Sequence, residues 1–311
     1  MRPGRGMVLR SCGAAVPDKV LTNEDLSARL DTSDKWITER TGIRERRIGG
    51  TASSLAIDAG RQALERAGLT GADIDVVIVA TATGDAVTPS TAAIVQDALG
   101  TAGAAFDLNA ACSGFVYGLV VAAGLIATGS GRILLVGSEV LSRITDWDDR
   151  TMAVLVGDGA GAVVLEPAEG EGNLLSANLN GDGSLRQLLT CDHGGYLAMD
   201  GREIFRRAIR VVVESAERAL GDAGIRAQDV ALFVPHQANL RIITAAGQRL
   251  GIPIERTAVV IDRYGNTSSA SIPLALEEAA RMGRVHEGDL VLLSGFGGGM
   301  TWASALLRWG P

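Results

Sequence analysis

An internal repeat restricts the folds open to this chain. Segment 67–80 (AGLTGADIDVVIVA) is matched by segment 223–234 (AGIRAQDVALFV), with the same spacing from the glycine through the aspartate to the apolar run. Further on, 131–137 (GRILLVG) is matched by 288–294 (GDLVLLS), and each copy then closes with a glycine-rich turn followed by an apolar run. Self-similarity of this kind is typical of structural duplication. The sequence therefore predicts two equivalent halves, residues 1–168 and 169–311.

Each half alternates helical patterns with short runs rich in Val, Ile and Leu. The helical patterns include 54–67 and 203–223, and Gly68 and Gly224 follow them as expected helix ends. Such alternation is typical of parallel sheets covered by helices, so we expect an α/β fold. Functional side chains would then lie just beyond the strand ends.

Composition excludes several classes of protein. With 311 residues and 47% hydrophobic content the chain can bury a large core. A net charge of -7 without a long basic run argues against nucleic-acid binding. Three cysteines do not make a disulfide framework, and a reactive thiol requires a reducing compartment, which indicates the cytoplasm.

One uncharged segment, between Asp107 and Arg132, is long enough to span a membrane. Asn109, Ser113 and Tyr117 interrupt it, and the flanking sequence has the pattern of a soluble protein. We therefore expect a fully buried core helix and no membrane association.

Cys112 is the candidate nucleophile. Residues 106–109 read as a strand and the uncharged stretch after Cys112 reads as a helix, so the thiol would lie at a helix N-terminus. Amides and the helix dipole there are expected to lower the thiol pKa. An isolated cysteine is more often a small core residue, but the setting Ala-Ala-Cys-Ser-Gly favours the nucleophile; Cys12 and Cys191 have no such setting and are interpreted as ordinary cysteines.

His236 and Asn266 are the candidate partners of Cys112. His236 follows an apolar run at an expected strand end, whereas His286 lies in a polar turn and is expected to be exposed. Cys191 and His193 alone are too few ligands for zinc, so no metal site is predicted.

Asn266 has the sequence surroundings of an ordinary turn residue. The repeat nevertheless places it about where Cys112 lies in the first half. A thiol, an imidazole and a carboxamide together suit acyl transfer, since they supply a nucleophile and donors to an oxyanion.

The chain resembles the β-ketoacyl-acyl carrier protein synthase III family of thiolase-fold condensing enzymes over nearly its whole length. The resemblance is carried by these motifs: 31–37 (DTSDKWI), 40–46 (RTGIRER), the surroundings of Cys112, 157–161 (GDGAG), 235–241 (PHQANLR), 265–268 (GNTS) and 296–299 (FGGG). It implies two duplicated α/β halves that form a layered α-β-α-β-α core.

The resemblance also implies a reaction. Cys112 takes an acyl group from acyl-coenzyme A, with the amides of Cys112 and Gly298 as oxyanion hole. Malonyl-acyl carrier protein then loses carbon dioxide, and His236 and Asn266 stabilise the enolate that attacks the acyl-Cys112 thioester. Coenzyme A is a substrate here, and no cofactor is expected.

Further roles follow from the resemblance alone. They are coenzyme A binding by Trp36, Arg40, Arg150 and Asn239, an acyl pocket or gate formed by Thr88, Phe205 and Phe296, carrier-protein docking by Arg206, Arg241 and Arg249, and a homodimer. Arg207 and Arg210 would extend the docking patch, and scattered solvated arginines are the alternative. The small Thr88 suggests primers longer than acetyl or branched, and the short stretch 190–196 leaves the channel rim undefined.

Other functions compete with condensation. A related acyltransferase of specialised metabolism would pass the acyl group to an alcohol or amine without decarboxylation, but the presence of Asn266 favours condensation. Cys112 argues against a silent partner subunit. A thiolase would need a second active-site cysteine.

Overall fold

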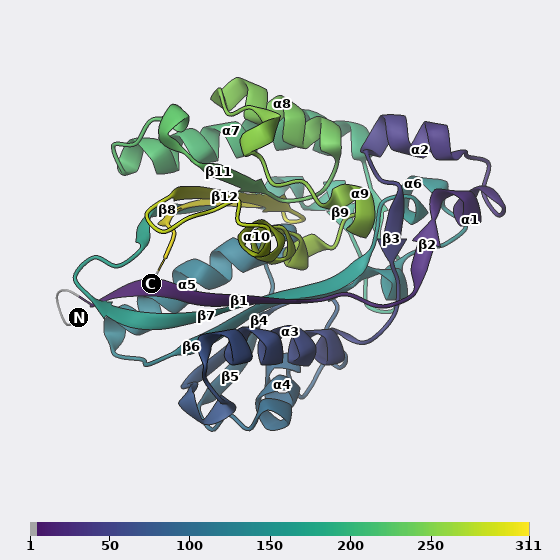
Figure 1. The fold of residues 1–311 in the computed structure, drawn as a ribbon. Helices are drawn as coiled ribbons and strands as arrows, with labels where there is room; N and C mark the ends of the chain where they lie inside the picture. Colours follow the sequence, from purple (N-terminus) through teal and green to yellow (C-terminus); the bar gives the residue numbers. More distant parts are fainter. Residues whose placement is uncertain (1–4, 311) are drawn as a thin grey trace.

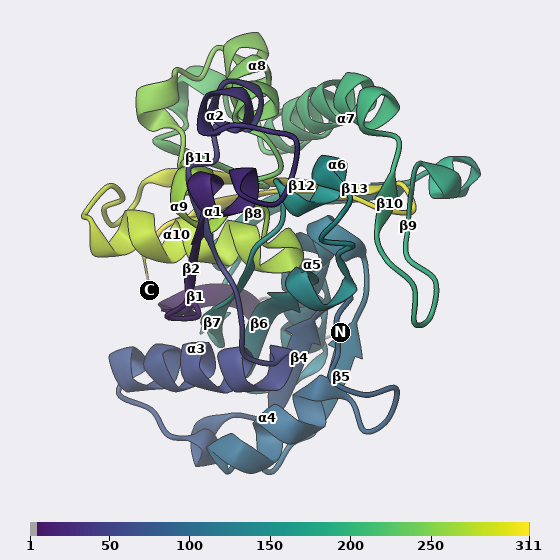
Figure 2. The same cartoon turned by 90° about the vertical axis from the view of Figure 1, so that its right-hand side faces the viewer.

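The fold consists of five layers in the computed structural model, which describes residues 5–310. Two sheets lie roughly parallel to each other, with helices between them and on both outer faces (Figure 1). Figure 2 shows the same order from the side, with α7 and α8 above, α5 and α10 in the middle, and α3 and α4 below. The predicted α-β-α-β-α architecture is confirmed.

The first sheet has five strands in the order β1-β7-β6-β4-β5. Its strands are β1 (Arg5–Ala15), β4 (Val76–Ala80), β5 (Ala104–Leu108), β6 (Ile133–Val140) and β7 (Asp158–Glu169). β4 pairs in parallel with both β5 and β6, whereas β7 is antiparallel to β1 and β6. Strands β4 and β6 are buried along their whole length, because helices cover both faces.

The second sheet repeats this pairing in the order β11-β12-β13-β8. Its strands are β8 (Leu174–Gly181), β11 (Leu232–Pro235), β12 (Leu290–Gly297) and β13 (Thr301–Arg308). β11 and β12 are parallel, and β13 is antiparallel to both neighbours. A single bridge between Phe233 and Thr257 stands where the first sheet has β5. Both sheets thus contain parallel and antiparallel pairs, which corrects the expectation of parallel sheets.

Six helices cover the sheets. α3 (Ala52–Ala67) and α4 (Thr91–Leu99) lie on one outer face, α7 (Gly201–Asp222) and α8 (Leu240–Leu250) on the other, and α5 (Gly114–Thr128) and α10 (Ser271–Arg281) lie between the sheets. Gly68 and Gly224 adopt φ of 71° and 66° at the ends of α3 and α7, so the prediction that they end these helices is confirmed.

The remaining elements are short. Several of them lie at the right of Figure 1: β2 (Val20–Thr22), α1 (Asn23–Ser27), α2 (Asp34–Thr41), β3 (Glu45–Arg47), α6 (Arg150–Ala153), β9 (Leu189–Thr190) and α9 (Ile261–Tyr264). The two-residue strand β10 (Ala198–Met199) pairs with β9. Single 3-10 turns are η1 (Gly71–Asp73), η2 (Ala111–Ser113), η3 (Leu141–Ile144), η4 (Gly183–Leu188), η5 (Ala227–Asp229), η6 (Ile254–Arg256) and η7 (Ser268–Ala270).

The uncharged segment forms the central helix α5. Window 111–128 is long and apolar enough to cross a membrane, but α5 packs between the two sheets. Phe115, Leu119 and Ile126 are fully buried, whereas Tyr117 and Val121 are only partly buried. The expectation of a fully buried helix is therefore wrong for one side of α5, which presents apolar side chains at the surface.

Candidate active site

Cys112 lies in the turn η2, between β5 and α5. Ala111 precedes it with φ of 47°, in the left-handed region that non-glycine residues rarely adopt. The Ser113 hydroxyl holds the turn closed, because its Oγ lies 2.7 Å from the Ala110 carbonyl and 2.9 Å from Thr301 Oγ1. Thr301 begins β13, so a strand of the second half fixes the turn that carries the thiol.

Glycines of β12 allow that strand to approach the Cys112 backbone. A Cβ atom at Gly297 would lie 2.5 Å from Cys112 N, and one at Gly295 would lie 3.2 Å from Cys112 O. Any larger residue would push the strand and the turn apart. Phe296, between these glycines, points to the opposite face and meets the His236 ring edge-on, with centroids 5.3 Å apart and planes at 70°.

His236 follows β11 directly, as its sequence position predicts. Its backbone N–H donates to the Ser294 carbonyl at 2.8 Å, which extends the pairing of β11 with β12. The side chain is 3% exposed, and burial lowers its pKa from 6.5 to about 3. His236 is therefore a neutral imidazole at physiological pH.

Asn266 is held by residues of the first half. Its backbone N–H donates to the Leu155 carbonyl at 2.8 Å, and its carbonyl accepts from Gly157 N–H at 2.9 Å. Its side-chain Oδ1 accepts from the Ser268 backbone N–H at 2.9 Å. Since the amide oxygen is occupied in this way, the Nδ2 group remains as a donor.

The first half contains a turn with the same local geometry as the turn at Asn266. Its position differs from the one that the sequence repeat predicted. Asn109 Oδ1 accepts from Ala111 N–H at 3.1 Å, and Ala111 and Ser268 share a φ of 47°. Asn266 thus corresponds structurally to Asn109 rather than to Cys112. The sequence comparison was wrong by about three residues, because it matched Asp107 of strand β5 with Asp262, which lies in the helix α9.

The Cys112 thiol is protonated in this site. The residue is only 8% exposed, and burial raises the thiol pKa from 9.0 to about 12, although the Ser268 hydroxyl acts in the opposite direction. The expectation of a lowered thiol pKa at a helix N-terminus is therefore wrong. Removal of the thiol from water outweighs the favourable position.

Glu139, a fully buried residue of β6, was missed by the sequence analysis. Its carboxyl accepts from Thr83 Oγ1 at 2.6 Å, Ser268 Oγ at 2.9 Å and Ser269 Oγ at 3.1 Å. Burial raises its pKa, and these hydrogen bonds oppose that shift. An acidic residue inside the apolar run 133–140 was the available signal, because such a group is buried only when it has partners. Glu139 ties the η7 turn beside Asn266 to the first sheet.

Two backbone amides fit the expected oxyanion hole. Within residues 5–310, neither Cys112 N–H nor Gly298 N–H donates to another residue outside the regular secondary structure; the Cys112 amide contacts its own thiol. Gly298 directly follows β12, one residue beyond the close contact of Gly297 with Cys112. Both amides are thus available as donors at the turn that carries the thiol.

Three of the four residues assigned to coenzyme A lie together. The guanidinium carbons of Arg40 and Arg150 lie 4.8 and 5.2 Å from the centre of the Trp36 ring. Asn239 adjoins this group through the backbone, since its Nδ2 donates to the Arg40 carbonyl at 3.0 Å, and its Oδ1 accepts from Arg241 N–H at the start of α8. Its side chain is therefore already hydrogen-bonded within the protein, and contributes to the cap of α8.

The arginines of the expected docking patch lie on α7 and α8, which pack against each other. Glu203 pairs with both Arg206 and Arg207, and Glu214 pairs with Arg210. Arg241 and Arg249 are exposed and have no ion pair among the described residues. The Arg241 guanidinium lies 4.9 Å from the centre of the Phe205 ring, so Phe205 lies beneath this patch.

The other predicted positions lie at the surface. Thr88 is exposed in the loop between β4 and α4, and stretch 190–196 begins in β9 and leaves Tyr196 60% exposed. Cys191, His193 and His286 are exposed. Among residues 5–310, no group of three or more His, Cys, Asp or Glu side chains is arranged to hold a metal ion.

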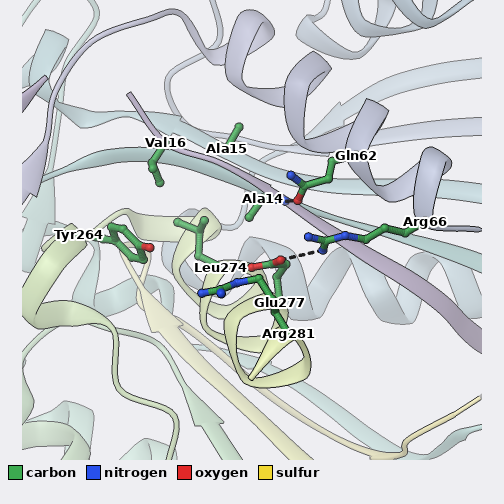
Figure 3. A pocket seen from close by; sticks show the side chains of 9 residues that line it. All are labelled: Ala14, Ala15, Val16, Gln62, Arg66, Tyr264, Leu274, Glu277 and Arg281. Atoms are coloured by element: carbon green, nitrogen blue, oxygen red, sulfur yellow. Dashed lines mark hydrogen bonds and ion pairs between the residues drawn. The ribbon is translucent and has the colours of Figure 1, made fainter. Parts of the chain in front are cut away.

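A separate pocket of about 200 Å³ lies between α3, β1 and α10 (Figure 3). Arg66 crosses it and donates to Glu277 Oε1 at 2.7 Å. None of the proposed reacting residues lines this pocket. The ion pair instead joins a helix of the first half to one of the second.

Comparison with known proteins shows the family of this chain. Residues 106–183 match the family described as 3-oxoacyl-[acyl-carrier-protein] synthase III, and residues 220–309 match its C-terminal region. The chain is similar to the beta-ketoacyl-[acyl-carrier-protein] synthase III of Erythrobacter litoralis, with 49% identity over 97% of this chain and 98% of that protein.

Solved structures are similar as well. That of 3-oxoacyl-[acyl-carrier-protein] synthase III from Aquifex aeolicus has a TM-score of 0.96 and 46% identity, and covers 98% of this chain and 100% of its own. The priming beta-ketosynthase of the R1128 polyketide pathway has a TM-score of 0.93 and 38% identity, and covers 99% of this chain and 98% of its own.

Proposed function

Because this chain belongs to the 3-oxoacyl-[acyl-carrier-protein] synthase III family and is a condensing acyltransferase, we propose that it joins an acyl-coenzyme A primer to malonyl-acyl carrier protein through acyl-Cys112. The reaction initiates fatty-acid synthesis. The observation that carries the role of Cys112 is its position, on a strained turn against two glycines of β12 and beside two available amides.

In the first step, Cys112 Sγ attacks the thioester carbonyl of the primer. The oxyanion accepts from the amides of Cys112 and Gly298, and the carbon–sulfur bond to coenzyme A breaks. The thiol proton ends on the departing coenzyme A sulfur, so the exchange consumes no net proton. This balance matters because burial keeps the Cys112 thiol protonated at rest.

In the second step, malonyl-acyl carrier protein loses carbon dioxide and leaves an enolate. Asn266 Nδ2 and the neutral His236 ring donate hydrogen bonds to the enolate oxygen. The enolate carbon attacks acyl-Cys112, the Cys112 thiolate leaves, and a proton from solvent restores the thiol. Steady-state kinetics with both substrates varied test this order: parallel double-reciprocal lines and a 3-oxoacyl carrier product are expected, whereas intersecting lines would contradict a covalent intermediate.

For primer binding, adenine would stack in the group formed by Trp36 and Arg150, with Arg40 at the phosphates. A planar guanidinium and an indole suit a nucleobase.

The acidic carrier protein would dock on Arg206, Arg241 and Arg249, since Arg241 and Arg249 have no acidic partner among the described residues. Phe205 and Phe296 would border the route to Cys112. The two steps require no cofactor, metal, nucleic acid or membrane. The reactive Cys112 thiol would be kept reduced in the cytoplasm.

A homodimer would cover an open sheet edge. Within the described residues β5 pairs only with β4, so its other edge is open. The Ala104 N–H donates to the Asp75 carbonyl, just before β4, so the N–H and C=O of the next residue, Ala105, face the open edge. The partly buried Tyr117, Val121 and Leu125 of α5 pack against the same core cluster as β5. We expect light scattering to give twice the chain mass of 32.2 kDa. Ala105→Pro should shift the protein towards monomer without loss of its circular dichroism, and a wild-type monomer would refute the dimer.

Thr88 would set primer length from the partner subunit. Its small side chain leaves room for acyl groups longer than acetyl or branched, so four-carbon primers should be used at least as well as acetyl-coenzyme A. Thr88→Phe should shift the kcat/KM ratio towards acetyl by about tenfold or more, as expected when a pocket loses several methylenes of space. A wild-type preference for acetyl-coenzyme A would refute this role.

A further inference from the structure

We propose that Ser271 is a positioning residue that keeps the proton of His236 on Nε2, an inference that rests on the proposed function. Ser271 is the first residue of α10, and its side chain is fully buried. It lies five residues after Asn266, in a segment for which the resemblance implied no role.

The hydrogen bonds of Ser271 define the direction of its hydroxyl. Its Oγ lies 2.7 Å from His236 Nδ1 and accepts from the Gln237 backbone N–H at 3.3 Å. Among residues 5–310, these are the partners of this oxygen, and no carbonyl or carboxyl lies within hydrogen-bond reach. A buried hydroxyl proton seeks an acceptor, and His236 Nδ1 is the acceptor in reach.

The ring proton of His236 follows from that direction. When Ser271 donates to Nδ1, this nitrogen carries a lone pair, and the neutral imidazole holds its single proton on Nε2. Burial keeps the ring neutral, and the edge-on contact with Phe296 restrains its rotation. The ring therefore presents an N–H donor from the nitrogen that Ser271 does not occupy.

This tautomer separates the roles of His236 in the two steps. A protonated Nε2 has no lone pair, so it cannot accept the Cys112 proton, but it can donate to the enolate oxygen together with Asn266 Nδ2. Asn266 is oriented in the same manner, since the Ser268 N–H occupies its Oδ1. Both donors are thus oriented by one short segment, 268–271.

Nitrogen-15 NMR of the histidine rings tests the tautomer without any assay of activity. The chain has only three histidines, and a His236→Gln variant identifies the signals of His236. We expect a protonated Nε2 and an unprotonated Nδ1 in the wild type. In Ser271→Ala we expect a shift towards the Nδ1–H form, and in Ser271→Thr, which keeps the hydroxyl, the wild-type pattern.

Partial reactions supply the second readout. Ser271→Ala should slow condensation of pre-formed acyl-enzyme roughly tenfold to a hundredfold. Acylation of Cys112 and KM for the primer should change less than about twofold, because the oxyanion amides are untouched. Ser304→Ala is the matched control, because Ser304 is equally buried and, among residues 5–310, its hydroxyl bonds only to Ser294 Oγ. In this variant the His236 tautomer and both rates should match the wild type.

A protonated Nδ1 in the wild type would overturn the proposal, and this result does not depend on the folding of the Ser271 variants. So would a Ser271→Ala variant with unchanged tautomer and condensation rate. If neither the wild type nor any variant catalysed condensation while Nε2 was protonated in the wild type, the proposed function would be refuted. The assignment of the tautomer would remain valid.

Discussion

Cys112→Ala is expected to abolish acylation of the protein by acyl-coenzyme A. The side chain supplies the sulfur that forms the new bond, and none of the surrounding groups can replace it, so condensation should fall by about 10⁴-fold or more. The turn itself should persist, since Ser113, Ala110 and Thr301 hold it through contacts that do not involve the thiol. Incorporation of a labelled acyl group measures the effect.

Cys191→Ala and Cys12→Ala are the matched controls. Cys191 is exposed, and burial raises the pKa of the Cys12 thiol to about 12 without placing it beside any of the proposed reacting groups. Both variants should acylate as the wild type does. Stable acylation of Cys112→Ala at the wild-type stoichiometry would show that another residue is the nucleophile.

Asn266→Ala is expected to separate the two half-reactions. Removing one donor to a developing oxyanion typically lowers kcat by 10²–10³-fold. Acylation should continue, because its oxyanion is bound by backbone amides, so acyl-enzyme should accumulate when malonyl-acyl carrier protein is added. Carbon dioxide release and the acyl-enzyme fraction measure the two steps separately.

Asn266→Asp tests whether the donor itself is responsible. An aspartate keeps the acceptor for the Ser268 N–H but lacks the Nδ2 group. It should therefore retain the turn and lose condensation as Asn266→Ala does. Equal loss of acylation and condensation in both variants would instead indicate that Asn266 merely supports the fold.

Much of the fold followed from the sequence because it depends on local patterns. The duplication, the helix ends at Gly68 and Gly224, and the positions of β4 and β11 all follow from spacing and residue type. Strand direction did not, since the antiparallel pairing of β7 with β1 and β6 depends on contacts between distant segments.

The candidate site was predictable in its residue types but less so in its electrostatics. Cys112, His236 and Asn266 stay predictions as catalytic residues. In the structure the Cys112 turn η2 contacts η7, which lies between Asn266 and Ser271, the partner of His236. The thiol pKa was predicted in the wrong direction, because the burial of Cys112 results from the approach of β12, far along the chain. Glu139 and the hydrogen bond from Asn239 to the Arg40 carbonyl were missed for the same reason, since their partners are remote in sequence.

Intact-protein mass spectrometry is the most direct test of the acyl-Cys112 intermediate. The protein is incubated with a panel of acyl-coenzyme A primers, and malonyl-acyl carrier protein is then added. We expect one acyl adduct, absent in Cys112→Ala, which disappears on addition of the malonyl carrier as carbon dioxide and a 3-oxoacyl carrier product form. An adduct that transfers only to alcohols or amines, or the absence of any adduct, would contradict this expectation.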